Sequence, residues 1–196
     1  MIERETVFCS DAAAWEAWLE AAHATSDGIR LAIAKKGRPV TSVSYADAVE
    51  LALCFGWIDG QAKRLDDDHY LQLFTPRRTR SIWSRINRDK ATRLIDEGRM
   101  RPAGLAEVER AQADGRWDAA YASSATIDVP DDLAGALVAN PVASEFFDTL
   151  TSQNRFAIIF RIGNVKRAET RARKIGEYVA MLERGDTLYP QRTTRP

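Results

Sequence analysis

The residues best suited to chemistry are concentrated in residues 56–87, GWIDGQAKRLDDDHYLQLFTPRRTRSIWSRIN. This stretch holds two tryptophans, three consecutive aspartates, one histidine and five arginines. Carboxylates beside a histidine can ligate a metal ion, an aspartate on a half-buried strand can transfer a proton, and clustered arginines can bind an anion. Each of these chemistries makes its own demands on spacing and on the neighbouring elements.

Metal binding would use Asp66, Asp67, Asp68 and His69. Calcium loops place their ligands at alternate positions around a glycine bend, and catalytic zinc sites need three protein ligands. The run of aspartates has neither pattern, so it is better explained as the solvated turn of a hairpin. We therefore expect no metal and no cofactor.

Nucleophilic catalysis would need a base beside a serine or cysteine, and the chain has only two histidines, His23 and His69. A serine nucleophile usually also lies on a sharp turn such as G-x-S-x-G, a motif that the sequence lacks. Asp59 could act in acid–base catalysis on a half-buried strand, together with Lys90 or Arg78. Its other interpretation is a turn at the end of that strand. No catalytic residue is assigned, and binding is favoured over catalysis.

Anion binding fits the stretch best, because TPRRTRS leads into a predicted helix from Ser81 to Glu97. A helix N-terminus presents free N–H groups and a partial positive charge, and arginines add forked donors there. At about 100° per residue, Asn87 and Lys90 fall inside the apolar stripe of this helix. They either line a cavity, or Asn87 fixes the preceding loop while Lys90 extends its amino group to water. The predicted ligand-binding residues are Trp57, Asp59, Arg77, Arg78, Ser81, Trp83, Ser84, Asn87 and Lys90.

Charge is balanced over the whole chain, with 28 Lys plus Arg and 28 Asp plus Glu, so no global attraction to nucleic acid or anionic membrane is expected. Two segments are locally basic, residues 76–93 and 155–174, each with seven basic residues and one acid. Arg167, Arg171 and Lys174 share one flank of a predicted helix and are expected to bind an acidic partner, protein or nucleic acid. The sequence has no helix-turn-helix, zinc-knuckle or RNP-type pattern, so nucleic acid stays the alternative.

The cysteines and the N-terminus predict a cytoplasmic protein. Cys9 and Cys54 make no disulfide framework, and Cys54 lies in the apolar run LALCFGW, where a buried, unreactive thiol is expected. Trp57 ends this run, and its replacement by alanine is expected to destabilise the fold by about 3–5 kcal/mol. The start MIERETVF lacks the apolar core of a signal peptide, and no apolar run approaches the roughly 20 residues that a membrane span needs.

The periodicity predicts an α+β fold: a small antiparallel sheet with flanking helices, followed by an all-helical module. Ser44 and the acid at Asp47 form a capping-box signal, and Asn140-Pro141 marks another helix start. Trp117 and Tyr121 are expected to pack between the two regions. The predicted organisation is an α+β domain (1–114), a linker (115–130), a helical module (131–184) and a flexible tail (185–196).

The chain resembles the bacterial YdeI/OmpD-associated proteins, also called bacteriocin-protection proteins, in SYADAVELALCFGWIDG, DDHYLQLFTPRRTRSIWSRIN, EGRM and DGRWDAAY. The stretch from Val129 to Gly185 is similar to that family's small helical module, with Val165 where the family usually has alanine. The resemblance extends over nearly the whole chain. It implies an N-terminal α+β portion similar to small frataxin-like or YjbR-like folds, tolerance of bacteriocins and antimicrobial peptides, and association with a porin. It implies no reaction and no cofactor.

Together these features predict a cytosolic binding or stress-tolerance protein, linked to bacteriocin or antimicrobial-peptide tolerance, with a cleft for an anion or another small ligand. The alternative is a nucleic-acid- or nucleotide-binding module. The second alternative is an acid–base enzyme that uses Asp59. A pocket shared by Trp57, Asp59, Trp83 and Asn87 would favour a binding protein or an enzyme, whereas a continuous positive face would favour nucleic acid.

Overall fold

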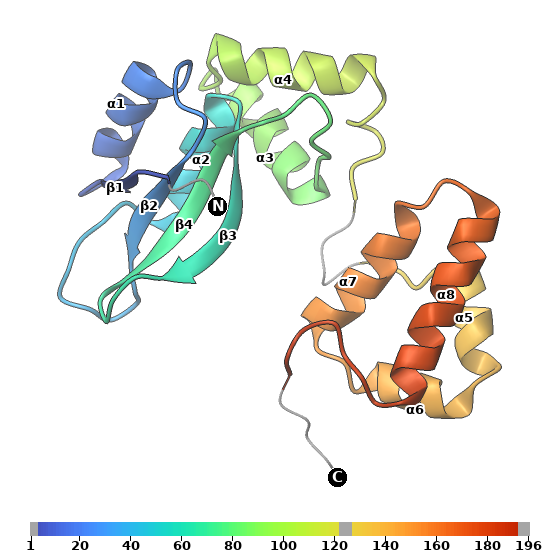
Figure 1. Cartoon of the computed structure of the whole chain (residues 1–196). Coiled ribbons are helices and arrows are strands. Elements are labelled where there is room, and N and C mark those ends of the chain that lie inside the picture. Colours follow the sequence, from blue (N-terminus) through green and yellow to red (C-terminus); the bar gives the residue numbers. More distant parts are fainter. Residues whose placement is uncertain (1–3, 122–126, 192–196) are drawn as a thin grey trace. The chain divides into compact units, whose positions relative to one another are not determined.

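The structure, a computed structural model, describes residues 4–121 and 127–191. It divides into two compact units, Met1–Tyr121 and Ala122–Pro196 (Figure 1). The first unit combines a sheet with helices and the second consists of helices, so the predicted α+β class is confirmed. Parts of the predicted linker and tail, residues 122–126 and 192–196, lie outside the described residues.

The sheet of the first unit has the strand order β1-β2-β4-β3. Its strands are β1 (Thr6–Phe8), β2 (Ile29–Ala34), β3 (Trp57–Arg64) and β4 (His69–Pro76). The predicted hairpin of β3 and β4 is present, and β4 also pairs antiparallel with β2. The short strand β1 escaped the sequence analysis. Because it runs parallel to β2, the sheet is mixed rather than wholly antiparallel.

The helices of this unit are α1 (Ala12–Ala22), α2 (Tyr45–Cys54), α3 (Arg85–Asp96) and α4 (Pro102–Ala113). Side chains alternate along a strand, so Ile29, Leu31 and Ile33 of β2 lie on one face of the sheet and join the core. The pairing register sets Phe74 of β4 opposite Ile29. Trp15 of α1 contacts Phe74 with ring centroids 5.5 Å apart, which packs this helix against the same face.

Two helix starts of the first unit follow the capping signals in the sequence. Asp11 accepts a hydrogen bond from the N–H of Ala14 at 2.9 Å and caps α1. Ser44 accepts from the N–H of Asp47 at 3.1 Å and donates to the Asp47 carboxylate at 2.7 Å. The first of these Ser44 contacts makes Ser44 the cap of α2, while in the second the Asp47 carboxylate binds the Ser44 hydroxyl rather than the Ser44 backbone N–H that the predicted capping box would use. Gly56 ends that helix with φ 74°, a conformation that glycine adopts without strain.

The third helix begins later than predicted. Ser81 was expected to open it, but α3 starts at Arg85 with Ser84 as its N-cap, and the Ser84 hydroxyl accepts from the N–H of Asn87 at 3.1 Å. The Ser81 hydroxyl instead accepts from the N–H of Arg78 at 2.9 Å, which closes a turn in the preceding loop. The assignment of Ser81 as the helix cap was therefore wrong.

A backbone bridge keeps the residues before α3 extended. The Trp83 carbonyl accepts from the N–H of Tyr121 at 3.0 Å, and the N–H of Arg85 donates to the Tyr121 carbonyl at 2.8 Å. Trp117 lies edge-on to Trp83 with centroids 4.9 Å apart, and so finds a partner within the first unit. Its expected contact with the C-terminal helices stays a prediction. The Arg116 side chain also donates to the Ser81 carbonyl, 35 residues away in the sequence. These distant contacts override the local helix signal at Ser81.

The second unit consists of the helices α5 (Asp131–Val138), α6 (Pro141–Asp148), α7 (Ser152–Gly163) and α8 (Ala168–Glu183). As the sequence predicted, α6 starts at Pro141, and the Asn140 side chain accepts from the N–H of Ala143 at 3.1 Å. Leu133 and Leu182 are completely buried in the core that the four helices share.

Both cysteines are free thiols inside the first unit. Cys54 is 2% exposed and Cys9 is 5% exposed, so the predicted burial of Cys54 is confirmed. Burial raises the pKa of both thiols. Among the helices of the described ranges, none is long and apolar enough to cross a membrane.

Candidate functional site

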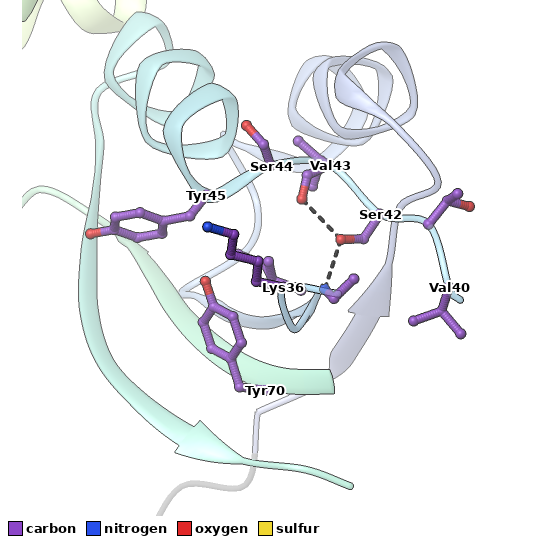
Figure 2. Close-up of a pocket in the computed structure, with 10 residues that line it drawn as sticks. Lys36, Val40, Ser42, Val43, Ser44, Tyr45 and Tyr70 are labelled. Carbon is purple, nitrogen blue, oxygen red and sulfur yellow. Dashed lines mark hydrogen bonds between the residues drawn. The ribbon is translucent and has the colours of Figure 1, made fainter. Parts of the chain in front are cut away.

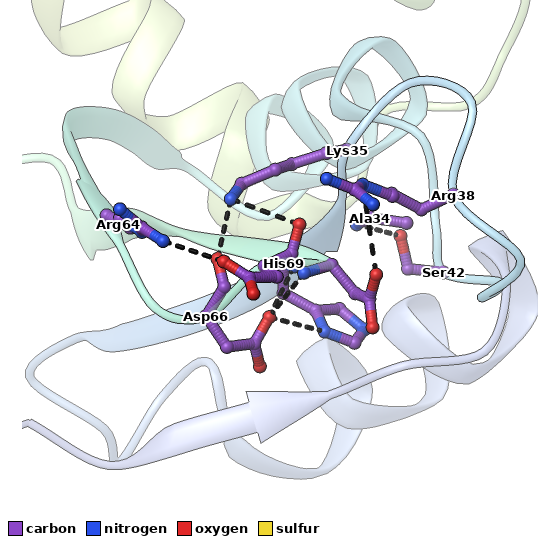
Figure 3. Close-up of polar contacts among 9 residues, drawn as sticks. Ala34, Lys35, Arg38, Ser42, Arg64, Asp66 and His69 are labelled. Carbon is purple, nitrogen blue, oxygen red and sulfur yellow. Dashed lines mark hydrogen bonds and ion pairs between the residues drawn. The ribbon is translucent and has the colours of Figure 1, made fainter.

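The run of aspartates forms the turn between β3 and β4 (Figure 3). The Asp66 carboxylate accepts from the N–H groups of Asp68 at 2.8 Å and His69 at 2.6 Å, and the His69 bond is the leading reason why the pKa of this carboxyl is lowered. Lys35 donates to the carbonyl oxygens of Asp66 and Asp67. These contacts fix a hairpin turn to the end of β2. Across the part of the chain that the structure describes, no group of His, Cys, Asp and Glu side chains is arranged to hold a metal ion.

Arg77 follows directly after β4 and points into the protein. Its side chain is only 5% exposed, and its backbone N–H donates to the carbonyl of Gly56 at 2.9 Å. A β-carbon at Gly56 would lie 2.8 Å from the carbonyl oxygen of Ala103 in α4. The end of α2, the end of β4 and the start of α4 therefore meet closely, and this junction holds the Arg77 backbone in place.

One nitrogen of the Arg77 guanidinium is hydrogen-bonded, and the other two form a free edge of the group. Its carbon lies 3.6 Å from the centroid of the Trp83 ring, so the two groups stack. Nη1 donates to the carbonyl of Ile82 at 3.3 Å. Nε and Nη2 are buried and have no hydrogen-bond partner within residues 4–121 and 127–191. These two nitrogens lie on the same edge of the planar group, which is the edge that binds a carboxylate or phosphate with two parallel bonds.

Burial makes this cation unusual. Desolvation is the leading cause that lowers the pKa of Arg77 to about 10, against attraction from Glu107, Tyr121 and Asp59 that raises it, and Arg116 lowers it further. A pKa of about 10 still leaves the group charged at neutral pH. The first unit therefore encloses a charged group whose free edge lacks an acceptor among the described residues, an arrangement that folded proteins rarely leave uncompensated.

Two neighbours of Arg77 also carry unsatisfied polar atoms. Glu107 of α4 accepts from Arg110 at 2.7 Å through Oε1, while its Oε2 is buried without a partner among the described residues. The indole N–H of Trp83 is likewise buried and unpaired there. Arg116 is tied down, since it donates to the Ser81 carbonyl at 2.6 Å. We call Arg77, Trp83, Glu107 and Arg116 the Arg77 cluster.

Asp59 lies near this cluster but is engaged elsewhere. Its carboxylate accepts a hydrogen bond of 2.7 Å from the hydroxyl of Tyr45, at the start of α2. Burial first, and then this contact with Asp59, raises the pKa of Tyr45, so the phenol stays a donor. Asp59 is thus held by a tyrosine, whereas the acid–base hypothesis paired it with Lys90 or Arg78.

Trp57, which the sequence analysis grouped with the site, is a core residue. It is 1% exposed, and its indole N–H donates to the carbonyl of His23 at 3.2 Å. Its ring meets Trp18 edge-on at 5.7 Å. It supports the sheet from the α1 side.

The remaining predicted ligand residues surround the start of α3. Arg78 is exposed, and Ser81 and Ser84 are half-buried and occupied with a turn and a helix cap. Asn87 and Lys90 are half-buried on α3. The structure therefore brings Arg77, Trp83 and Asp59 into one neighbourhood and distributes the others around it.

The predicted partner-binding residues of the second unit differ in availability. Arg171 donates to both oxygens of the Asp132 carboxylate, at 2.6 and 2.9 Å, and to the Ile162 carbonyl at 2.9 Å. It therefore fastens α8 to α5 and α7. Arg167 is exposed at the N-cap of α8, and Lys174 is half-buried on the same helix.

Sequence reasoning missed Glu107, Arg116 and Tyr45. Glu107 lies three residues before Arg110 on a surface helix, a pattern typical of a solvated ion pair. Arg116 lies 39 residues from Arg77 in a segment that resembled a linker. Their proximity to Arg77 depends on tertiary packing, and no local signal encodes it.

Fold and site define a chain with an α+β unit around a buried arginine and a separate four-helix unit. The chain belongs to the family described as "Domain of unknown function (DUF8412)", whose model matches residues 7–107. Residues 126–185 match the model described as "Bacteriocin-protection, YdeI or OmpD-Associated". The resemblance to that family is thus confirmed for the C-terminal part, while the first unit matches a different model. Searches of curated proteins and of solved structures found no match.

Proposed function

We propose that this protein binds a small ligand through a carboxylate or phosphate group, held by the free edge of Arg77. The observation that carries the proposal is the buried Nε and Nη2 of Arg77, which have no acceptor among the described residues. A planar guanidinium edge donates two parallel hydrogen bonds to an oxyanion, and such charge-assisted bonds are stronger than neutral ones.

An anion suits the surroundings better than a water molecule does. Water could accept the two hydrogen bonds, but it would leave the buried charge of Arg77 unneutralised. The Trp83 indole N–H offers one more donor beside the guanidinium. Arg78 is exposed next to the site, where we propose that it attracts the ligand electrostatically without holding it.

The biological role that we propose is a cytosolic one in tolerance of bacteriocins or antimicrobial peptides. Support comes from the description of the family that matches residues 126–185. In a bacterial strain that lacks this protein, wild type should restore survival of a bacteriocin challenge. If Arg77→Gln restores it equally, ligand binding at Arg77 has no part in that role.

The direct test is the unfolding of the full chain in sodium acetate and in sodium phosphate, each compared with sodium chloride at equal ionic strength. Tryptophan fluorescence follows the first unit, because all five tryptophans lie within it. Binding should stabilise the unit by about 2.7 kcal/mol when the ligand is a hundredfold above its Kd. Chloride controls for general screening.

Two variants that each remove one positive charge distinguish binding at Arg77 from a general effect of charge. Arg77→Gln removes the guanidinium and should abolish the stabilisation by acetate or phosphate. Arg80→Gln removes the same charge from an exposed position of the same loop and should preserve this stabilisation. Equal stabilisation of wild type and Arg77→Gln would show that the free edge of Arg77 is filled by water, and the proposal would fail.

A nucleic-acid-binding function is the second candidate, and one feature of α3 favours it. Its first turn contains no acidic residue and begins with Arg85, so the positive end of the helix dipole is not offset there. Arg78 and Arg80 are exposed in the preceding loop. Binding to a single-stranded oligonucleotide that weakens steeply with salt, and weakens further in an Arg78→Ala/Arg80→Ala variant, would support this function.

A further inference from the structure

A second candidate site lies at the other end of the sheet, in a pocket of about 590 Å³ beside the start of α2 (Figure 2). None of its ten lining residues belongs to the Arg77 cluster. Its volume falls within the range of about 300–1,000 Å³ that is usual for small-molecule sites. The pocket is formed by the ends of β2 and β4 and by the chain that connects β2 to α2.

One wall of the pocket is apolar and fixed. Ile33 and Val43 are 3% and 1% exposed and belong to the core of the first unit. The hydroxyl of Ser42 accepts from the N–H of Ala34 at 2.8 Å and donates to the Val43 carbonyl at 3.0 Å. These bonds, dashed in Figure 2, fasten the connecting chain to the end of β2. The pocket is therefore formed without a ligand.

The lining contains a single charged side chain, Lys36. Its neighbour Lys35 is occupied, since it donates to two carbonyls of the hairpin turn. By contrast, no hydrogen bond or ion pair engages the Lys36 amino group in the ranges that the structure describes. Figure 2 shows the Lys36 side chain between Tyr45 and Tyr70. Lys36 is exposed, so water solvates its amino group, and the partly apolar lining beside it favours a ligand that combines a negative charge with an apolar body.

The two tyrosines supply flat walls and a second donor. The Tyr70 hydroxyl points toward Lys36 in Figure 2 and has no hydrogen-bond partner among the residues described. Burial raises the pKa of Tyr70, so its hydroxyl is a neutral donor at physiological pH. The Tyr45 hydroxyl is already committed to Asp59 at 2.7 Å, which fixes the orientation of its ring.

The N-terminus of α2 adds little to this charge pattern. Its first turn contains Asp47, whose carboxylate offsets the helix dipole and accepts the Ser44 hydroxyl at 2.7 Å. The positive character of the pocket therefore comes from Lys36. The apolar wall and the tyrosine rings provide the surface for an uncharged, flat body.

We propose that this pocket binds an aromatic carboxylate, with its carboxylate on Lys36 and the Tyr70 hydroxyl and its ring between the tyrosines and the apolar wall. The site is independent of the Arg77 cluster, and it selects for both charge and shape. An aliphatic anion would lose the ring contacts, and a neutral aromatic would lose the two polar contacts.

The test uses three probes that share a phenyl ring and differ in charge: benzoate, benzamide and benzylamine. Amide chemical shifts of the full-length protein are followed during each titration. Benzoate should bind about tenfold more tightly than benzamide, because it adds a charge-assisted contact. Benzylamine should not bind. The shifts should concentrate at Ala34, Ser42 and the first turn of α2.

Four variants make the result decisive. Lys36→Met should weaken benzoate by about tenfold and leave benzamide unchanged, and Tyr70→Phe should weaken benzoate by about fivefold. Lys63→Met removes an exposed lysine outside the pocket lining and should change neither affinity. Arg77→Gln should also leave benzoate binding intact, which separates this site from the proposed function. Equal affinity for the three probes, no shifts at millimolar benzoate, or an unchanged affinity in Lys36→Met would overturn the proposal.

Discussion

Replacing Arg77 with methionine should leave the ligand-free protein nearly as stable as wild type. Burial lowers the pKa of Arg77 to about 10, and at about 1.36 kcal/mol per pH unit this shift disfavours the charged form by roughly 3 kcal/mol. Stacking on Trp83 offsets about 1–2 kcal/mol of this, and the bond to the Ile82 carbonyl about 1 kcal/mol. Methionine keeps the contact with the Trp83 ring and removes the charge.

The expected change in the free energy of unfolding is therefore within about 1 kcal/mol, whereas breaking a well-formed buried ion pair costs about 3–5 kcal/mol. The assay is urea unfolding followed by tryptophan fluorescence, which reports on the first unit alone because Trp15, Trp18, Trp57, Trp83 and Trp117 all lie there. Chloride buffer without other anions keeps the Arg77 edge free of carboxylate and phosphate.

A loss of about 3 kcal/mol or more would refute the reasoning, because it would mean that Arg77 is already paired inside the folded protein. Glu107 is the carboxylate that attracts Arg77 most strongly, so it is the candidate partner. A double-mutant cycle of Arg77→Met and Glu107→Gln measures their coupling. We expect less than about 1 kcal/mol, since the Glu107 oxygen that could pair with Arg77 has no partner among the residues that the structure describes.

Four further results are expected. Trp57→Ala should destabilise the first unit by about 3–5 kcal/mol in the same assay, because the side chain is 1% exposed. Cys54 should react with a thiol reagent only as fast as the protein unfolds, since burial raises its pKa and blocks access. Asp59→Asn should lower the raised pKa of Tyr45, measured in an absorbance titration. Because the pKa of Tyr45 is higher in the folded than in the unfolded chain, the stability that depends on neutral Tyr45 is present below pH 10.0 and is lost as the pH rises toward the folded pKa. Arg171→Lys should destabilise the second unit by about 1 kcal/mol, measured by amide exchange in α8, because lysine cannot form the two-pronged bond.

Elements whose signals are local could be predicted from the sequence. The start of α2 followed from the spacing of Ser44 and Asp47. Asn140-Pro141 likewise marked the start of α6. In each case, the residues that fix the element lie within one or two turns of one another, so a single sequence is sufficient.

Elements that depend on distant contacts could not be predicted in this way. Ser81 and Ser84 offer similar capping signals, and the bridge between Ser84 and Tyr121 decides between them. The strand Thr6–Phe8 is three residues long and takes its pairing from β2. The candidate site also depends on distant contacts, because Glu107 and Arg116 come near Arg77 only through the packing of α4 and of the segment that follows it.

Burial distinguishes neighbouring side chains of the same type, which the sequence alone cannot do. Arg77 and Arg78 are adjacent and identical in type, yet one is 5% exposed and the other faces solvent. Lys35 and Lys36 also differ in environment, since Lys35 is half-buried and bound to the hairpin turn, whereas Lys36 is exposed and lines the pocket. An exposed cation such as Lys36 is solvated by water and its ion pairs contribute little, so the proposal for its pocket depends equally on the tyrosines and the apolar wall. An unsatisfied buried donor costs about 1–3 kcal/mol, so among these four cations Arg77 alone requires an acceptor. The density of arginine in TPRRTRS is therefore a weaker guide to binding than the environment of the first arginine in it.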